Sequence, residues 1–171
     1  MNSLEIFATQ LSLSVLAVSM LAKWSVMPWL EGKSLKNVLM ILIAPHAMRH
    51  VGLTFLVPSI VDPGIAQSFT HQAAYGDFIS GLLAIATLVL LKKDRCSAIA
   101  AVWIFNIVGT VDLLNALSQA AAVPYLGGTW YIPTFFVPIL LVTHFLIFVK
   151  LFQHHRGTRS IGLCSSGTCS E

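Results

Sequence analysis

The chain of 171 residues is 56% hydrophobic and only 10% charged, with a mean hydropathy of +0.81. Ordinary soluble domains carry about 25% charged residues, so the composition excludes that class and indicates a polytopic membrane protein. The net charge of +3 resides in short basic clusters between apolar runs, as expected for loops that face anionic lipid, and we expect no nucleic-acid partner.

Five apolar runs are long enough to cross a hydrocarbon core, which takes about 20 helical residues. We predict an all-α integral membrane protein with helices over residues 4–22, 36–60, 70–91, 96–121 and 130–151. The first run has neither a basic flank nor a small-residue cleavage site before Lys23, so it is interpreted as a helix and not as a signal peptide. Residues 1–152 are predicted to form one compact five-helix domain. The Gly- and Ser-rich residues 153–171 are predicted to form a disordered cytoplasmic tail.

The basic residues predict an orientation, because Lys and Arg near helix ends are retained on the cytoplasmic side. Except for Arg49, they lie within residues 23–36, 92–95 and 150–159, after the first, third and fifth predicted helices. The opposite side carries Glu5 and Asp62 and no Lys or Arg. The sequence therefore predicts an outside N-terminus and a cytoplasmic C-terminus. We expect a multi-pass protein of the cell membrane, which in a Gram-negative bacterium is the inner membrane.

Arg49 is the one Lys or Arg in the interior of an apolar run, since Lys36 and Lys150 stand at the ends of theirs. An arginine near the centre of a bilayer is costly, and it is normally turned inward, partnered and functional. On an α-helix, His46 and His50 share the face of Arg49, because the three residues are spaced i, i+3 and i+4. Pro45 removes a backbone donor just before this polar stripe and is expected to bend the helix.

Asp77 and Asp112 are the expected counter-ions of Arg49. At a rise of 1.5 Å per residue, they lie roughly 20 Å from the inner ends of their helices, at the level of Arg49. Arg49 is expected to pair with one of the two. The other must then be protonated, paired with a protonated histidine or bound to a cation, which makes the site sensitive to pH or ions.

Other polar residues of the apolar runs extend this candidate site. The set for binding a ligand or handling protons is His46, Arg49, His50, Tyr75, Asp77, Asp112 and Asn115. Further candidates are Asn106, Gln119 and His144. The alternative is that the uncharged members only hold helices together, since hydrogen bonds between membrane helices average about 0.6 kcal/mol.

The spacing of His46 and His50 resembles one histidine box of the membrane di-iron hydroxylases and desaturases. Those families use several such boxes, whereas only His46, His50, His71 and His144 lie outside the tail here. We predict no metal ligands, because Arg49 between the two histidines would repel a cation. A haem between His46 or His50 and His144 stays an alternative, although their estimated depths differ by about 6 Å.

These residues are best explained by a site that binds or translocates a small anionic or proton-coupled solute. Arg49 would anchor the solute, the histidines would switch protonation, and Asp77 or Asp112 would act as gate or counter-ion. Five helices are few for a transporter, so we expect a homo-oligomer or a larger membrane complex in the lipid bilayer. A membrane enzyme acting on a lipid or isoprenoid, a redox protein and a structural subunit remain alternatives. The sequence identifies neither substrate nor cofactor, and it leaves open whether the chain is an enzyme.

Overall fold

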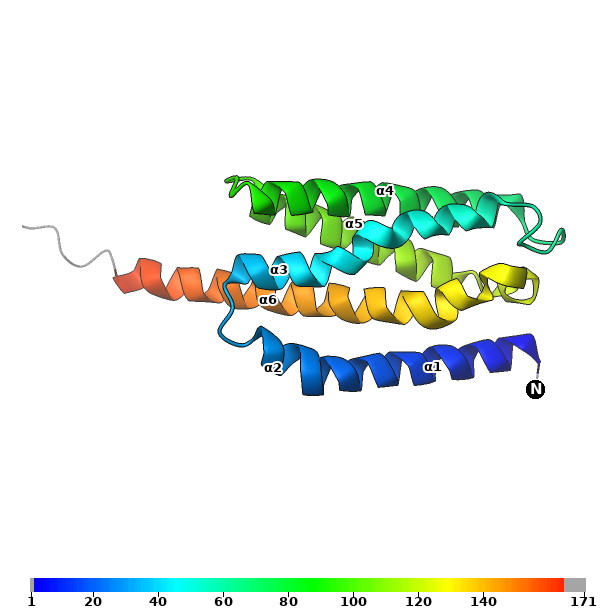
Figure 1. Cartoon of the computed structure of the whole chain (residues 1–171), viewed down its shortest axis with the longest axis horizontal. Coiled ribbons are helices and arrows are strands. Elements are labelled where there is room, and N and C mark those ends of the chain that lie inside the picture. The colour runs from blue at the N-terminus through cyan, green and yellow to red at the C-terminus, as the bar shows by residue number, and fades with distance from the viewer. Residues whose placement is uncertain (1, 165–171) are drawn as a thin grey trace, which may run out of the picture.

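The computed structural model describes residues 2–164, and all its regular elements in that range are helices (Figure 1). Five helical stretches are long and apolar enough to span a membrane: Ser3–Leu30, Leu35–Leu56, Gln67–Lys92, Ala98–Ser118 and Gly127–Arg156. The predicted all-α class with five helices of spanning length is therefore confirmed. The stretches lie side by side along one long axis (Figure 1).

The first stretch lies along one side of the bundle. Helix α1 (Ser3–Leu21) passes through a π-helical segment, η1 (Ala22–Val26), into the short α2 (Met27–Leu30). Its N-terminus carries a capping box, in which the Asn2 side chain accepts from the Glu5 amide at 2.8 Å and the Glu5 carboxylate accepts from the Asn2 amide at 3.0 Å. Phe7 is the only buried residue of α1, so most of its apolar side chains face outward, as on a helix that contacts lipid.

The second stretch changes helix type at its middle. It begins as α3 (Leu35–Ile43) and continues as a 3₁₀ helix, η2 (Ala44–Leu56). The change of helix type falls directly before Pro45. A proline lacks the N–H that an α-helical bond would need and clashes with the carbonyl four residues earlier, which favours a change of backbone geometry here. At 13 residues, η2 is far longer than the usual 3₁₀ run of 3–4 residues.

The 3₁₀ geometry decides which residues of η2 point inward. With three residues per turn, every third side chain falls on the same face, and the buried residues are His46, Arg49, Gly52 and Phe55. His50 is exposed. The prediction that His50 shares the face of Arg49 was wrong, because it assumed the 3.6-residue period of an α-helix.

The remaining stretches enclose η2. Helix α4 (Gln67–Lys92) runs along η2 and pairs with α5 (Ala98–Ser118) (Figure 1). Three short turns follow, the 3₁₀ helices η3 (Ala120–Tyr125) and η4 (Gly127–Trp130) and the π-helical η5 (Ile132–Phe136). The last helix, α6 (Val137–Cys164), packs against α1, α3 and α5.

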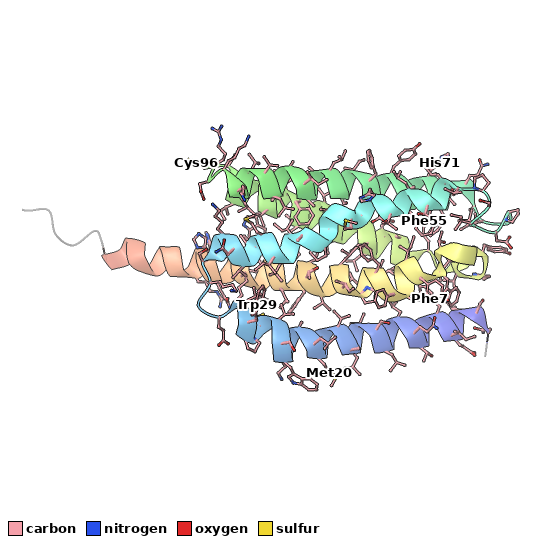
Figure 2. The ribbon with its side chains drawn as sticks, viewed as in Figure 1. Phe7, Met20, Trp29, Phe55, His71 and Cys96 are labelled. Carbon is pink, nitrogen blue, oxygen red and sulfur yellow. The ribbon has the colours of Figure 1, made fainter. Side chains whose placement is uncertain are left out.

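The two ends of the bundle differ in charge. At one end Lys36 forms an ion pair with Asp94 at 2.7 Å, which ties the start of α3 to the turn between α4 and α5. We call this the basic end, and Figure 2 labels Trp29 and Cys96 there. At the other end, the loop end, Gly128 N donates to Ile60 O at 2.7 Å, which joins the two connecting loops.

Helix α6 is longer than the sequence suggested. We predicted that its helix ends at residue 151 and that disorder begins at residue 153, but α6 continues to Cys164. No proline occurs in residues 139–171, and each residue added to an existing helix gains one hydrogen bond without a new nucleation step. Residues 165–171, the rest of the predicted disordered tail, lie outside the described residues.

Candidate functional site

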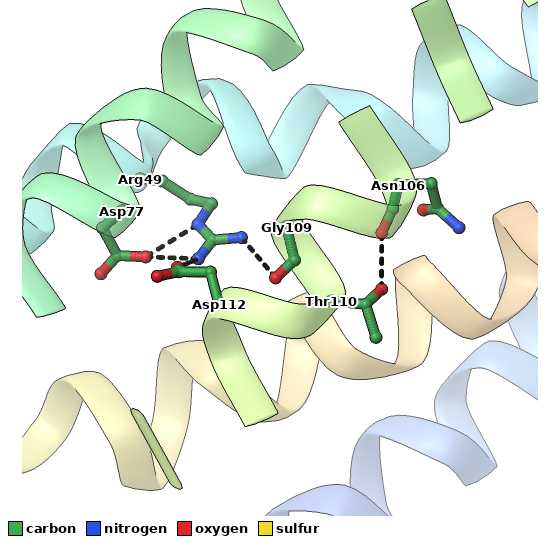
Figure 3. Close-up of polar contacts among 6 residues, drawn as sticks. All are labelled: Arg49, Asp77, Asn106, Gly109, Thr110 and Asp112. Atoms are coloured by element: carbon green, nitrogen blue, oxygen red, sulfur yellow. Dashed lines mark hydrogen bonds and ion pairs between the residues drawn. The ribbon is translucent and has the colours of Figure 1, made fainter. Parts of the chain in front are cut away.

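Arg49 forms a buried ion-pair cluster with two aspartates (Figure 3). Its Nε donates to Asp77 Oδ1 at 2.8 Å, and its Nη2 lies 2.7 Å from the same oxygen. Nη2 also donates to Asp112 Oδ2, and Nη1 donates to the carbonyl of Gly109 at 3.2 Å. Every guanidinium nitrogen therefore has a partner. The sequence predicts one aspartate as the partner of Arg49, whereas both aspartates pair with it in the structure.

Formal charge does not balance in this cluster. One guanidinium faces two carboxylates, so the cluster carries one excess negative charge when both aspartates are ionised. The side chain of Arg49 is fully enclosed, at 0% exposure, whereas those of Asp77 and Asp112 are 12% and 16% exposed. An excess charge in so dry a place needs a proton or another cation.

Three glycines make room for the cluster. A Cβ on Gly52 would overlap the carboxylate of Asp77, and a Cβ on Gly76 would overlap that of Asp112. A Cβ on Gly109 would lie 3.0 Å from Arg49 Nη1. These glycines are not among the residues that the sequence predicts for the site. The signal was available in part, since Gly52 follows Arg49 by three residues, which is one 3₁₀ turn.

An apolar pocket ends on the two carboxylates. Its volume is about 50 Å³, several times the 10–15 Å³ that one water needs by the same measure. Phe7, Phe55 and Phe69 contribute to its mostly apolar wall, together with Asp77 and Asp112. Arg49 does not line it. Because Phe7 and Phe69 begin the first and third stretches, the pocket lies toward the loop end.

Two histidines lie beside the cluster, toward the basic end. His46 Nε2 is 2.9 Å from Thr143 Oγ1, and His144 Nδ1 is 2.7 Å from Asn106 Oδ1. The centroids of the two imidazoles are 4.1 Å apart. The depth difference of about 6 Å expected from the sequence was therefore wrong. It was counted from predicted inner helix ends taken to lie at one height, whereas α6 continues past residue 151. The structure therefore places His144 and Asn106 beside the ion-pair cluster.

The contact between the two rings also tests the haem alternative. A haem iron is held between two axial imidazoles with the macrocycle separating them. Here His46 and His144 touch each other directly, and Phe105 packs on both at centroid distances of 5.1 and 5.3 Å. These histidines do not have the arrangement of a bis-histidine haem site.

Several residues predicted for the site lie away from it. His50, Tyr75 and Asn115 are exposed, and the ring of Tyr75 contacts that of His71 at a centroid distance of 6.0 Å. Gln119 lines the pocket, but its amide donates to Gln72 at 2.8 Å. The prediction that His50, Tyr75 and Asn115 lie together with Arg49 was wrong. His50 lies on the outer face of η2, and the faces of α4 and α5 that pack inward are those of Asp77 and Gly109.

Asn106 provides a test of how tightly the histidine pair is held. Asn106→Leu should lower the free energy of unfolding by about 1–3 kcal/mol, because it leaves the buried His144 Nδ1 and the His144 carbonyl without their partners. Thermal unfolding in detergent measures the effect. The control is Thr110→Val on the same helix, whose hydroxyl bonds only the Asn106 carbonyl of its own helix (Figure 3). Equal losses in the two variants would contradict the assignment.

Five helices of spanning length around a buried ion-pair cluster define an all-helical protein whose helices are compatible with several membrane crossings. The chain belongs to the family described as Domain of unknown function (DUF8737), which matches residues 6–152. The comparisons with curated proteins and with solved structures gave no match. The matched range includes Arg49, both aspartates and both buried histidines.

Proposed function

We propose that the chain binds a small cationic solute with an apolar body in the loop-end pocket, in exchange for a proton. The observation that carries this proposal is the exposure of the cluster: the carboxylates of Asp77 and Asp112 reach the pocket, whereas Arg49 does not. The apolar wall favours a hydrocarbon body, and the excess negative charge favours a positive end. A proton and the solute then compete for the same carboxylates.

The geometry favours a proton-coupled solute over the anionic solute that the sequence suggested as the other possibility. An anion would need donors from Arg49, but Arg49 does not line the pocket, and each of its three nitrogens already bonds Asp77, Asp112 or the Gly109 carbonyl. An anion in the pocket would also meet the two carboxylates first, which is repulsive at short range in an apolar site.

The distribution of basic residues supports an orientation for this exchange. Lys36, Lys92 and Arg95 gather at the basic end, which we assign to the cytoplasmic side of the cell membrane. The loop-end pocket then opens toward the outside. The exposed apolar side chains of α1 are assigned to lipid or to a second copy of the chain, which keeps a homo-oligomer within the proposal.

The charge preference can be tested with three probes of equal length: butylammonium, butanol and butyrate. We expect butylammonium to raise the Tm of the purified protein most, because it fits the apolar wall and neutralises the carboxylates. Its effect should weaken as the pH falls, since protons then occupy the same groups. The measurement is thermal unfolding against probe concentration at several pH values.

Two aspartate variants provide the comparison. Asp112→Asn makes the cluster neutral and should remove the advantage of butylammonium over butanol. Asp94→Asn removes an aspartate at the basic end, far from the pocket, and should leave the advantage intact. A stronger effect of butyrate than of butylammonium would overturn the proposal and restore the anionic solute.

A further inference from the structure

The histidine pair carries two buried ring nitrogens that the site described so far does not use. His46 is 0% exposed and His144 is 1% exposed. Within the described part of the chain, His46 Nδ1 and His144 Nε2 have no hydrogen-bond partner. Buried polar atoms are normally paired, so two unpaired nitrogens on adjacent rings require an explanation.

The tautomer of His46 follows from its neighbour on α6. The Thr143 hydroxyl has a single hydrogen, which it donates to the Ile139 carbonyl at 2.8 Å or to the Leu140 carbonyl at 3.0 Å. Its oxygen therefore accepts from His46 Nε2–H at 2.9 Å. In the neutral ring, His46 Nδ1 then carries a bare lone pair.

The tautomer of His144 follows from Asn106. The Asn106 amide nitrogen donates to the His144 carbonyl at 3.2 Å, which fixes the orientation of the amide group. Asn106 Oδ1 must then accept from His144 Nδ1–H at 2.7 Å. His144 Nε2 carries the second bare lone pair, so both unpaired nitrogens are acceptors that lack a donor.

The lone pair of His144 Nε2 lies close to the ion-pair cluster. A Cβ built on Gly109 would be 2.8 Å from His144 Nε2 and 3.0 Å from Arg49 Nη1, so both atoms lie at the same glycine. Arg49 in turn touches both carboxylates. The order along the bundle, from the loop end toward the basic end, is pocket, carboxylates, Arg49 and histidine pair.

We propose that His144 and His46 form a second proton-accepting site, so that protons entering at Asp77 and Asp112 are carried past Gly109 toward the basic end. This inference rests on the proposed function, in which the carboxylates bind an exchangeable proton. The proton leaves a carboxyl oxygen and is accepted by the lone pair of His144 Nε2. Beyond the pair the core is apolar, with Leu42, Ile43 and Ile147 buried, so transfer is slow and not that of an open channel.

The charged groups around the pair make this transfer reversible. Arg49 faces it from η2, and its positive charge disfavours a proton on either imidazole. Asp77 of α4 and Asp112 of α5 offset that charge through their bonds to Arg49. The uncharged neighbours are Phe105 and Asn106 of α5 and Thr143 of α6. The pair therefore accepts a proton when the carboxylates are ionised and releases it readily.

Proton uptake into liposomes that contain the purified full-length chain and an internal pH dye tests the inference. A potassium diffusion potential drives the protons inward. We expect the wild type to acidify the lumen faster than protein-free liposomes. Asp112→Asn and His144→Gln should each return the rate to that of protein-free liposomes. His50→Gln is the matched control, since His50 is exposed on the same helix as His46, and it should keep the wild-type rate.

Nitrogen-15 NMR of histidine-labelled protein tests the same inference without a substitution in the core. The buried pair should give one ring with Nδ1–H and one ring with Nε2–H. The exposed histidines are assigned with four variants: His50→Gln, His71→Gln, His154→Gln and His155→Gln. Two rings of the same tautomer would overturn the inference. So would a wild-type rate equal to that of protein-free liposomes, or full uptake by a folded His144→Gln.

The two proposals fail separately. Butylammonium binding that depends on Asp112, together with no proton uptake, would retain the solute site and overturn the histidine site. Proton uptake that depends on Asp112 and His144, without butylammonium binding, would retain the histidine site and overturn the solute site.

Discussion

Arg49→Met is expected to have the largest effect on stability, a loss of about 3–5 kcal/mol. The change leaves the carboxylates of Asp77 and Asp112 in a buried place without their cation. Loss of the guanidinium also removes the donor to the Gly109 carbonyl. Thermal or denaturant unfolding in a fixed detergent measures the loss, and at low pH, where the carboxylates are protonated, the loss should shrink.

A charge-neutral combination separates lost charge balance from lost packing. Arg49→Met with Asp77→Asn and Asp112→Asn carries no charge in the cluster and should recover most of the stability, since replacing a buried ion pair as a whole is often neutral. If the triple variant is as unstable as Arg49→Met alone, shape and not charge is what the cluster contributes, and the expected role of Arg49 is wrong.

Gly76→Ala is expected to lower the free energy of unfolding by about 1–3 kcal/mol. Alanine inside a helix normally stabilises it relative to glycine by about 0.5–1 kcal/mol. Here the added Cβ would overlap the Asp112 carboxylate, which must then move away from Arg49. The same variant should weaken the preference for butylammonium, which thermal unfolding with the three probes measures.

Gly81→Ala is the matched control on the same helix. Its added Cβ would have Arg49 Cβ as a nearest neighbour at 3.5 Å, an ordinary van der Waals contact. The variant should therefore be neutral or slightly stabilising. Equal destabilisation by the two alanines would mean that α4 needs glycine for its backbone and not for the space that Asp112 occupies.

The charged part of the candidate site could be predicted from the sequence because a charge within an apolar run needs a partner. Arg49 cannot remain unpaired in an apolar run, and Asp77 and Asp112 were the acids at a comparable depth. The sequence could not decide whether one or both aspartates pair with Arg49, because a guanidinium can bind one carboxylate or two. His144 was only a further candidate, because its contact with His46 depends on the relative heights of two helices along the bundle axis. The lengths of the helices do not determine those heights.

The wrong assignments have a different cause. His50 was placed beside Arg49 by the α-helical period, and the 3₁₀ geometry of η2 turns it outward while bringing Gly52 and Phe55 into line with Arg49. Asn115 and Tyr75 were chosen for their polarity within apolar runs. Which face of α4 and α5 is turned inward depends on the glycines that let these helices approach one another.

The sequence by itself determined the helical class and the five spanning stretches, because these depend on the length and apolarity of local segments. The tertiary structure decided that both aspartates meet Arg49 and that the rings of His46 and His144 touch. Those contacts depend on the local helix type, the relative levels of the helices and the space left by Gly52, Gly76 and Gly109. Such quantities arise only when separate helices pack, and no single segment carries them.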